Sequence, residues 1–387
     1  MKKVAVLGAT GSIGKSALDV IARGKNDFEI VLLSAHSNRD GLEQAGKAWP
    51  EAQKICSGDP EGRERLLEAI AGCGADITIN GISGAAGLEP SMAAVEAGSD
   101  LALANKETLV MAGPLVIKRA NEKNINIIPV DSEHSAIFHL LEAHCKADSA
   151  GSDGLDEIIL TASGGPFRNY SIEEMEKAGP KAALAHPTWN MGAKISIDSA
   201  SMANKGLEVI EASRLFNLNG QRLSDGQGFP PEKIKVVIHP QSIVHSMIKL
   251  KDGELYAQLS RPDMRLPILK ALYWPKLPPS EESGNWGFGR LDFNGLALEF
   301  FQPDPQKFPM LPLAYEAVKK GGLYPCAYNA ANEAAVAAFL AGRVGFLDIG
   351  RITRYVLDSD WSAEPSDIAS VMEADKKARE LAEKEIK

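Results

Sequence analysis

The sequence predicts an α/β protein whose N-terminal part is a doubly wound parallel sheet. Short apolar runs that suit buried strands recur along the first third of the chain, at residues 4–7, 30–34, 77–79, 101–104 and 127–130. Amphipathic patterns with helical spacing separate these runs. Strands that alternate with helices are typical of a parallel sheet covered by helices on both faces.

A glycine-rich turn follows the first expected strand. Residues 8–14 read Gly-Ala-Thr-Gly-Ser-Ile-Gly, and a helical pattern comes next, with Ala17, Val20 and Ile21 on one face. Glycines at such a junction let backbone N–H groups approach a pyrophosphate, whose charge the helix N-terminus attracts. We therefore expect a Rossmann-like dinucleotide site here. The alternative is a glycine-rich turn that binds no ligand.

The end of the second expected strand indicates which dinucleotide is bound. NAD sites usually place Asp or Glu there, where the carboxylate holds the ribose 2′-hydroxyl. Residues 34–39 instead read Ser-Ala-His-Ser-Asn-Arg, so hydroxyl, amide and basic groups are present and an acid is not. This favours NADP(H) over NAD(H). The alternative is a capped turn, in which Ser37 or Asn38 starts a helix from Asp40.

The last of these strands runs directly into Asp131-Ser132-Glu133. In extended backbone, residues i and i+2 point to the same side, so the two carboxylates would face one point and favour a bound cation. The alternative is a helix N-terminus, which Asp131 or Ser132 caps. Ligands bind at the carboxyl ends of parallel strands, and residues 105–107 (Asn-Lys-Glu) should open on the same edge. This shared edge favours the metal interpretation.

A second domain with an α+β composition is expected next. The strand at residues 158–162 is followed by Ser163, Gly164 and Gly165. Small residues expose backbone N–H groups and can form an anion-binding nest, although a tight turn explains them equally well. Further strands on both sides of residues 251–253 (Lys-Asp-Gly) predict an antiparallel hairpin.

Residues 194–199 alternate like a strand, and a helix is expected from about Ala200. That helix would place Ser201, Lys205 and Glu208 on one face, since they lie at i, i+4 and i+7. A cation, a hydroxyl and a carboxylate on one face suggest a binding site. The alternative is a surface ion pair between Lys205 and Glu208.

On the functional interpretation, Ser199, Asn204 and Lys205 bind a phosphate, while Glu208 adds a third carboxylate to a metal site. Carboxylates without Cys or His select a hard cation, Mg²⁺ or Mn²⁺. The loop at residues 186–192 (His-Pro-Thr-Trp-Asn-Met-Gly) has no periodicity. Its tryptophan is either a buried anchor or part of a movable lid over a substrate.

Composition excludes several classes of protein. The chain has 387 residues, of which 44% are hydrophobic, and a formal net charge of −9, which argues against nucleic-acid or anionic-membrane partners. No apolar run reaches the ~18 residues that a membrane span needs. Because Met1 leads directly into strand residues, we expect no signal or transit peptide. The four cysteines are widely spaced, which fits a reducing cytoplasm.

These patterns predict four consecutive segments. They are a dinucleotide-binding domain at 1–131, an α+β domain at 132–270, a linker at 271–305 and a helical domain at 306–387. The helical domain is expected to support the others without contributing chemistry. Asn332 and Glu333 are polar within its alanine-rich run, and the pattern assigns them no role.

Taken together and in order, these motifs resemble the 1-deoxy-D-xylulose-5-phosphate reductoisomerase family over nearly the full length. The stretches that carry the resemblance are residues 8–14, 104–107, 130–136, 163–167, 186–192 and 198–208. It implies rearrangement and reduction of 1-deoxy-D-xylulose 5-phosphate to 2-C-methyl-D-erythritol 4-phosphate. It also implies NADPH, a divalent cation (Mg²⁺ or Mn²⁺, with Co²⁺ as a further alternative), an α+β catalytic domain and a homodimer.

The resemblance assigns roles to residues at the matching positions. The implied metal ligands are Asp131, Glu133 and Glu208. The implied catalytic residues are Lys106, Asp131, Glu133, His186 and Glu208. The implied substrate-binding residues are Lys106, Ser132, Glu133, Ser163, His186, Ser199, Asn204, Lys205 and Glu208. The implied NADPH-binding residues are Thr10, Gly11, Ser12, Ile13, His36, Ser37, Asn38, Asn105, Glu107 and Gly192.

Two features depart from the family pattern. Many relatives have Gly-Lys where this chain has His36-Ser37, so the usual lysine for the 2′-phosphate is missing. Either Arg39 takes its place or the preference for NADPH is weaker. Residues 217–231 also form a longer connection than usual, which we expect to be a surface loop.

Two other functions are compatible with a dinucleotide domain followed by a second domain. A semialdehyde dehydrogenase needs a cysteine nucleophile beside a base, and none of the four cysteines has such a setting. A sensor that binds NADP without catalysis would need neither three carboxylates nor a phosphate pocket. Both alternatives are therefore disfavoured.

Overall fold

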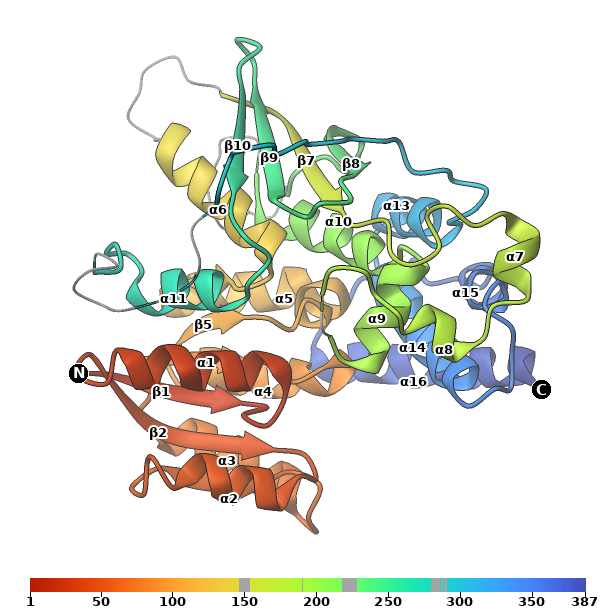
Figure 1. Cartoon of the computed structure of the whole chain (residues 1–387). Helices are drawn as coiled ribbons and strands as arrows, with labels where there is room; N and C mark the ends of the chain where they lie inside the picture. Colours follow the sequence, from red (N-terminus) through yellow and green to blue (C-terminus); the bar gives the residue numbers. More distant parts are fainter. Residues whose placement is uncertain (146–153, 190, 218–227, 280–285, 287, 289–290) are drawn as a thin grey trace. The chain divides into compact units, whose positions relative to one another are not determined.

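The computed structural model describes residues 1–145, 154–189, 191–217, 228–279, 286, 288 and 291–387 (Figure 1). By its internal contacts the chain forms two compact units. The first unit comprises Met1–Thr108, Val116–Ser135 and Asp263–Arg290, and the second comprises Leu109–Leu115, Ala136–Pro262 and Leu291–Lys387. This division differs from the four consecutive segments expected from the sequence, since the chain passes between the units several times.

The first unit contains a six-stranded parallel sheet in the order β3-β2-β1-β4-β5-β6. Its strands are β1 (Lys2–Leu7), β2 (Phe28–Ala35), β3 (Gln53–Cys56), β4 (Ile77–Asn80), β5 (Asp100–Leu103) and β6 (Ile127–Pro129). The predicted doubly wound sheet is therefore confirmed. The sequence patterns missed β3, because half of this short edge strand is polar and at least partly exposed.

Helices cover this sheet and carry the amphipathic patterns seen in the sequence. They are α1 (Ser12–Arg23), α2 (Arg39–Gly46), α3 (Gly62–Gly72), the 3₁₀ helix η1 (Gly84–Gly87), α4 (Leu88–Glu96) and α11 (Arg265–Tyr273). The apolar face of α1 buries Ala17, Val20 and Ile21, as predicted. Two further helices, α5 (Glu107–Lys123) and α6 (Ser132–His144), contain residues of both units.

The segment that contains α11 belongs to the first unit, although it lies far from the rest of that unit in the sequence. Arg265 forms an ion pair with Asp19 of α1 at 2.9 Å, and the ring of Tyr273 packs edge-on against Phe28. Trp274 and Trp286 are buried. The expected linker is therefore divided, because its described residues up to 288 belong to the first unit and those from Leu291 onward belong to the second.

The second unit contains a four-stranded mixed sheet in the order β10-β9-β7-β8. Its strands are β7 (Leu155–Ala162), β8 (Ile234–Ile238), β9 (Val244–Leu250) and β10 (Leu255–Leu259). The predicted hairpin joins β9 and β10, and Gly253 supplies its left-handed turn conformation with a φ of 96°. This confirms the expected α+β character.

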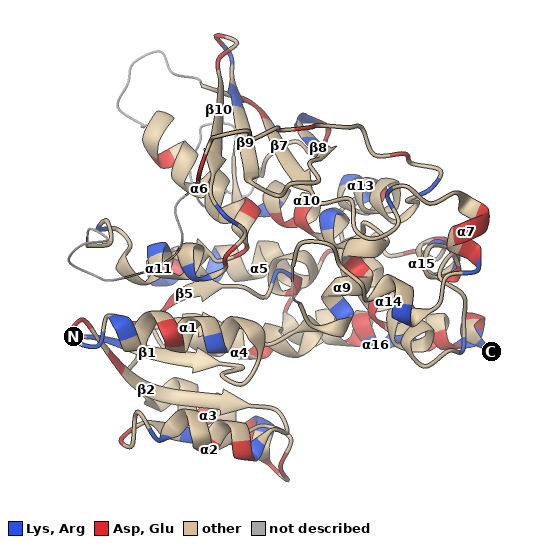
Figure 2. Ribbon diagram, in the orientation of Figure 1, with Lys and Arg blue, Asp and Glu red and all other residues tan. Residues whose placement is uncertain are grey.

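The second unit also contains helices, and the two longest described helices that lie wholly within it are α14 (Tyr324–Leu340) and α16 (Ile368–Ile386). The others are α7 (Ile172–Glu176), α8 (Pro180–Ala183), α9 (Ala193–Ala200), α10 (Ala203–Leu215), η2 (Pro231–Lys233), α13 (Met310–Lys320) and α15 (Asp348–Leu357). Small residues let α14 bury almost its whole circumference. Charges of both signs lie along α16 (Figure 2).

The strand expected at residues 194–199 is wrong, because these residues form α9. Their alternation spans too few residues to exclude a helix. In the helix, Ile197 and Ala200 are three residues apart and both are buried, so the same pattern suits a helical face. The next helix, α10, begins at Ala203 rather than near Ala200, after Met202 takes a left-handed φ of 59°.

The long connection predicted at residues 217–231 lies largely outside the described residues, which omit 218–227. Its described end is anchored, because Phe229 is buried and Ser213 bonds its backbone. The expectation of a surface loop is therefore wrong for this end. No described helix combines the length and the apolar character that crossing a membrane would require.

Candidate active site

The glycine turn of the first unit has the geometry of a phosphate cradle. Gly8 has a left-handed φ of 78°, and a Cβ on Gly14 would lie 2.3 Å from the Gly8 carbonyl oxygen. No side chain in the described structure caps α1 at Gly11. Backbone N–H groups at this helix N-terminus therefore suit a pyrophosphate. Thr10, Gly11, Ser12 and Ile13 lie in this turn, so the residues present fit a dinucleotide.

The end of β2 is a capped turn, as the alternative interpretation stated. The Asn38 side chain accepts a hydrogen bond from the Gly41 N–H at 2.9 Å and starts α2, while Ser37 is exposed. The His36 Nδ1 lies 3.3 Å from the Ser57 hydroxyl. The turn therefore presents polar groups at the strand end, and capping occupies the side-chain oxygen of Asn38.

Arg39, the candidate partner for a 2′-phosphate, already has an acidic partner. Its guanidinium pairs with Asp59 in a contact where the arginine side chain remains largely exposed. Asp59 follows β3, the strand that the sequence patterns missed. The competing carboxylate beside Arg39 was therefore not predicted from the sequence.

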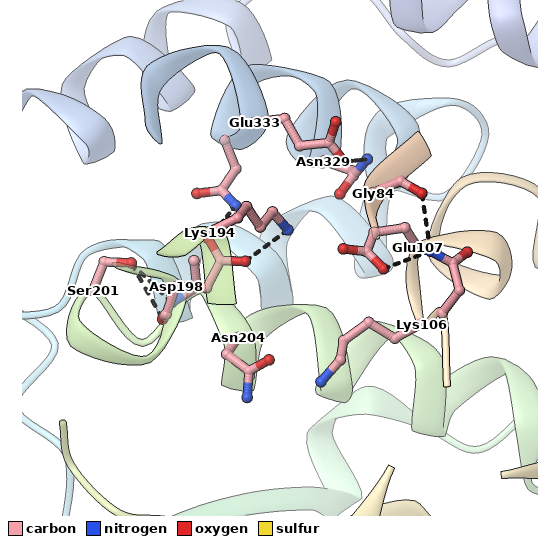
Figure 3. Close-up of polar contacts among 12 residues, drawn as sticks. Gly84, Lys106, Glu107, Lys194, Asp198, Ser201, Asn204, Asn329 and Glu333 are labelled. Carbon is pink, nitrogen blue, oxygen red and sulfur yellow. Dashed lines mark hydrogen bonds and ion pairs between the residues drawn. The ribbon is translucent and has the colours of Figure 1, made fainter. Parts of the chain in front are cut away.

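Asn105 and Glu107 occupy the carboxyl end of β5. The Asn105 amide is buried and donates to the Ile82 and Gly84 carbonyls at 2.7 and 2.9 Å. It also bonds the Glu107 carboxylate at 3.0 Å (Figure 3). Its oxygen accepts the Thr108 N–H at 3.0 Å. The Asn105 side chain thus braces the start of α5 against the η1 turn.

Lys106 and Asp131 bring the ends of β5 and β6 together. The lysine ammonium lies 2.5 Å from the Asp131 carboxylate, and both side chains are at most 12% exposed. Asp131 also caps α6, since its carboxylate accepts the Glu133 N–H at 3.3 Å and its carbonyl accepts the Ser135 N–H at 2.8 Å. A carboxylate with this anchoring is held in one orientation.

The expected extended arrangement of Asp131 and Glu133 is wrong, because α6 already begins at Ser132. The helix-cap alternative is confirmed, and it does not exclude metal binding by the remaining oxygen lone pairs. The Ser132 hydroxyl donates to the Glu133 carboxylate at 2.5 Å. The His134 Nδ1 lies 3.7 Å from the Asp131 carboxylate. The first unit thus gathers carboxylates and one ammonium at the sheet edge that carries the glycine turn.

In the second unit, His186 joins two predicted substrate-binding serines. Its Nε2 lies 2.9 Å from the Ser163 hydroxyl and 3.1 Å from the Ser199 hydroxyl. Its Nδ1 accepts the N–H groups of Thr188 and Trp189 at 3.2 and 2.9 Å, which assigns the ring proton to Nε2. Burial lowers the pKa of His186, so the neutral ring is favoured.

The small residues after β7 form a tight, nest-like turn. Gly164 and Gly165 have left-handed φ values of 81° and 60°. The Gly165 N–H donates to the Ser163 hydroxyl at 3.2 Å. A Cβ on Gly165 would lie 2.9 Å from the Ser199 carbonyl oxygen, so only glycine lets this turn approach the end of α9. The two loops and α9 thereby place Ser163, His186 and Ser199 in one cluster.

Glu208 of α10 is a buried carboxylate with two donors. Lys205 Nζ and Asn204 Nδ2 each lie 2.6 Å from its oxygens. Lys205 and Glu208 are 4% and 0% exposed, so the alternative of a surface ion pair is wrong. Ser201, expected on the same face, instead precedes α10, and its hydroxyl donates to the Asp198 carbonyl at 3.3 Å (Figure 3).

The loop around Trp189 is only partly buried. The Trp189 ring is half-buried and makes an edge contact with the His245 ring, with the centroids 6.3 Å apart. Asn190 lies outside the described residues. Gly192 is exposed and starts α9. The Trp189 ring is thus neither a fully buried anchor nor an exposed side chain.

One polar network beside the cluster was missed by sequence reasoning. Asp198 is 1% exposed, and its carboxylate accepts from Lys194 at 2.6 Å and from Asn332 of α14 at 2.9 Å. Figure 3 shows Lys194 reaching Asp198 along α9. The available signals were the i,i+4 spacing of Lys194 and Asp198 and the polar Asn332 in an apolar helix.

Known proteins match this chain over nearly its full length. The family model described as 1-deoxy-D-xylulose 5-phosphate reductoisomerase matches residues 4–61 and 51–113. The model for that family's C-terminal domain matches residues 127–216, and the model for the DXP reductoisomerase C-terminal domain matches residues 259–381. A 1-deoxy-D-xylulose 5-phosphate reductoisomerase from Treponema denticola is 47% identical over 98% of this chain and 96% of its own length.

The chain belongs to the 1-deoxy-D-xylulose 5-phosphate reductoisomerase family. A second such reductoisomerase, from Chlorobaculum tepidum, is 46% identical over 99% of both chains. The reductoisomerase from Zymomonas mobilis, solved with NADPH, has a TM-score of 0.84 and 40% identity over 100% of this chain and 99% of its own. A reductoisomerase solved with NADPH, fosmidomycin and magnesium has a TM-score of 0.85 and 37% identity, covering 100% and 98%.

Proposed function

We propose that this chain converts 1-deoxy-D-xylulose 5-phosphate to 2-C-methyl-D-erythritol 4-phosphate, with NADPH as reductant and a divalent cation. The observation that carries the proposal is the match of the whole chain to a relative solved with NADPH, fosmidomycin and magnesium. In this proposal, residues of both units provide the groups that the chemistry needs.

The proposed metal ligands are Asp131 and Glu133 of the first unit and Glu208 of the second. The donor chemistry fits, since three carboxylates suit a hard cation such as Mg²⁺ or Mn²⁺, or Co²⁺. Asp131 is oriented by Lys106, and Glu208 by Lys205 and Asn204. A bound cation would polarise the carbonyl and hydroxyl oxygens of the substrate as a Lewis acid.

The proposed phosphate site lies in the second unit. Ser163, His186 and Ser199 share a hydrogen-bond cluster, which supports their acting together on one anion. The neutral His186 can donate through Nε2, and the residues that complete this site are Asn204 and Lys205. Binding the phosphate away from the reacting carbons supplies energy that orients the substrate for the chemical step.

Lys106 and Ser132 are proposed to contact the reacting end of the substrate, and Lys106, Asp131, Glu133, His186 and Glu208 are the proposed catalytic residues. The buried Lys106 ammonium can stabilise oxyanion character while a carbon–carbon bond breaks and re-forms. Bound NADPH would supply the hydride that reduces the rearranged aldehyde. The loop around Trp189 is proposed as a lid that excludes water during this sequence.

The proposed NADPH site lies in the first unit. The cradle formed by Gly8 and Gly14 fits the pyrophosphate. The remaining proposed contacts are Thr10, Gly11, Ser12, Ile13, His36, Ser37, Asn38, Asn105, Glu107 and, from the second unit, Gly192. Since Asp59 pairs with Arg39, we propose that the arginine exchanges this partner for the 2′-phosphate.

We also propose that the protein is a cytoplasmic homodimer with the domains expected from the sequence. The four cysteines are free thiols, which suits a reducing compartment.

Large apolar side chains of Phe293, Phe300 and Phe301 are more than 40% exposed, which suits a surface covered in a dimer. Sedimentation analysis would give the mass of a dimer, whereas a monomer at micromolar concentration would contradict this proposal.

The activity is tested by incubating the purified protein with 1-deoxy-D-xylulose 5-phosphate, NADPH and Mg²⁺. The proposal predicts that one NADPH is oxidised per product formed, and that the product is 2-C-methyl-D-erythritol 4-phosphate by mass spectrometry and NMR. Absence of NADPH oxidation in the presence of substrate and metal would contradict it.

A further inference from the structure

Two polar side chains lie on one face of α14, deep in the second unit. Tyr328 and Asn332 are at positions i and i+4, and both are 0% exposed. Polar groups are buried at a cost unless they form hydrogen bonds. The hydrogen-bond partners of these two side chains therefore indicate the role of this face of α14. The sequence had predicted that this helical region contributes no chemistry.

Asn332 holds α9. Its amide donates to the Asp198 carboxylate at 2.9 Å, and the other Asp198 oxygen lies 2.6 Å from Lys194 of the same helix. The next residue is Ser199, whose hydroxyl lies 3.1 Å from the His186 ring. Because the contact with Asn332 restricts rotation of α9 at Asp198, it also positions the hydroxyl of the adjacent Ser199.

Tyr328 holds α10. Its hydroxyl donates to the Met310 carbonyl of α13 at 3.1 Å, and burial raises its pKa, so it stays protonated. A Cβ on Gly206 would lie only 2.6 Å from this hydroxyl. Gly206 lies in the same helical stretch as Lys205 and Glu208, so the hydroxyl fixes how closely α10 approaches α14.

We propose that Asn332 and Tyr328 are positioning residues for the phosphate site. Through Asp198 and Gly206 they fix α9 and α10 relative to each other, so that Ser199 and Lys205 present one binding set. Neither residue needs to touch the substrate. This inference rests on the proposed function of the second unit as the part that binds the substrate phosphate.

The chain offers a matched control on the same helix. Asn329 is also an asparagine of α14 at 0% exposure, but its amide donates to Glu333 within α14 at 3.1 Å (Figure 3). Asn329→Ala and Asn332→Ala remove the same atoms from equally buried positions. Only Asn332→Ala releases a contact to α9.

The experiment compares steady-state kinetics of Asn332→Ala, Asn329→Ala and the unaltered chain. Asn332→Ala should raise the KM for 1-deoxy-D-xylulose 5-phosphate about tenfold while changing kcat much less, because the pocket is displaced and not removed. Competitive inhibition by inorganic phosphate should weaken in parallel, and the Kd for NADPH should not change. Asn329→Ala should leave KM unchanged, even if both variants melt at a similarly lowered temperature.

A swap of donor and acceptor tests the same contact by rescue. Asn332→Asp places two carboxylates together, and adding Asp198→Asn restores a donor and an acceptor at this position. The double variant should regain a lower KM than Asn332→Asp alone, which a general loss of packing would not produce. This arm also serves if Asn332→Ala fails to fold.

Equal KM values for the two alanine variants, together with no rescue in the swap, would overturn the positioning role. Failure of the unaltered chain to turn over the substrate would overturn the proposed function instead, and it would be seen before any variant is compared. In that case calorimetric binding of inorganic phosphate to the same variants still tests the positioning role.

Discussion

The glycine turn of the first unit and the His186 cluster of the second are both suited to bind phosphate groups, but they are built differently. The glycine turn relies on backbone, since Gly8 and Gly14 admit no Cβ and the start of α1 supplies N–H groups. The His186 cluster relies on side chains from separate segments, which meet through the hydrogen bonds of Ser163 and Ser199. A backbone site tolerates no added atoms, whereas a side-chain site depends on distant supports.

The largest effect is expected at the buried carboxylate of the second unit. Glu208→Gln keeps the shape of the side chain but removes the charge that pairs with Lys205 and that the proposed cation would require. Turnover should fall by about 10³-fold or more, because electrostatic stabilisation of the reacting oxygens is lost. NADPH affinity, measured by fluorescence titration, should stay within about twofold. Turnover near the level of the unaltered chain would refute the metal role of Glu208.

A methyl group in the glycine turn tests the backbone-built site. Gly14→Ala places a Cβ about where the Gly8 carbonyl stands, at 2.3 Å, so the turn must open. NADPH binding should weaken about 100-fold, since overpacking of this kind costs about 1–3 kcal/mol. Inhibition by inorganic phosphate should be unaffected, because its proposed site lies in the second unit. Unchanged NADPH affinity in this variant would show that the turn is not the pyrophosphate site.

A smaller effect is expected at the ion pair between Arg39 and Asp59. Arg39→Ala should weaken NADPH binding about tenfold and leave NADH binding unchanged, because only NADPH carries the 2′-phosphate. Asp59→Asn should strengthen NADPH binding slightly, since the Arg39 side chain is largely exposed and its ion pair with Asp59 contributes little free energy. Equal losses for NADPH and NADH in Arg39→Ala would exclude a 2′-phosphate contact.

The smallest effect is expected on the pH dependence of the free energy of unfolding, to which His186 contributes. Burial lowers the pKa of His186 in the folded protein, below the ordinary value of about 6.5. As the pH falls below that value, the unfolded chain takes up the proton first, so the folded state loses stability until the pH reaches the lowered pKa. His186→Asn keeps an acceptor for the Thr188 and Trp189 N–H groups but cannot titrate.

The variant should therefore lose less free energy of unfolding than the unaltered chain between about pH 8 and about pH 5.5. Denaturant titration at both pH values measures this difference. His239, whose pKa burial also lowers, contributes equally to both proteins and cancels in the comparison. Identical losses in the two proteins would contradict the assignment of a buried neutral ring.

The comparison also explains what the sequence could predict. The first sheet and the glycine turn were predictable because local patterns determine them: buried strands, a helix face and the backbone freedom of glycine. The expected extended geometry of Asp131 and Glu133 failed because a strand end and a helix start share the same few residues. Residue spacing at this junction could not distinguish them.

The second unit was less predictable because its contacts join distant positions. The pairing of Asp198 with Asn332 spans 134 residues, and no local pattern reports it. The strand expected at 194–199 followed from an alternation that α9 satisfies equally well. Burial of Lys205 and Glu208 likewise depends on the packing of α13 and α14, which one helix face does not specify.

The most direct test of the account is the metal dependence of NADPH oxidation in the presence of 1-deoxy-D-xylulose 5-phosphate. We expect that EDTA stops the reaction, that added Mg²⁺ or Mn²⁺ restores it, and that NADPH still binds to the protein in the presence of EDTA. Undiminished turnover in the presence of excess EDTA would contradict the central claim that three carboxylates bind a catalytic cation.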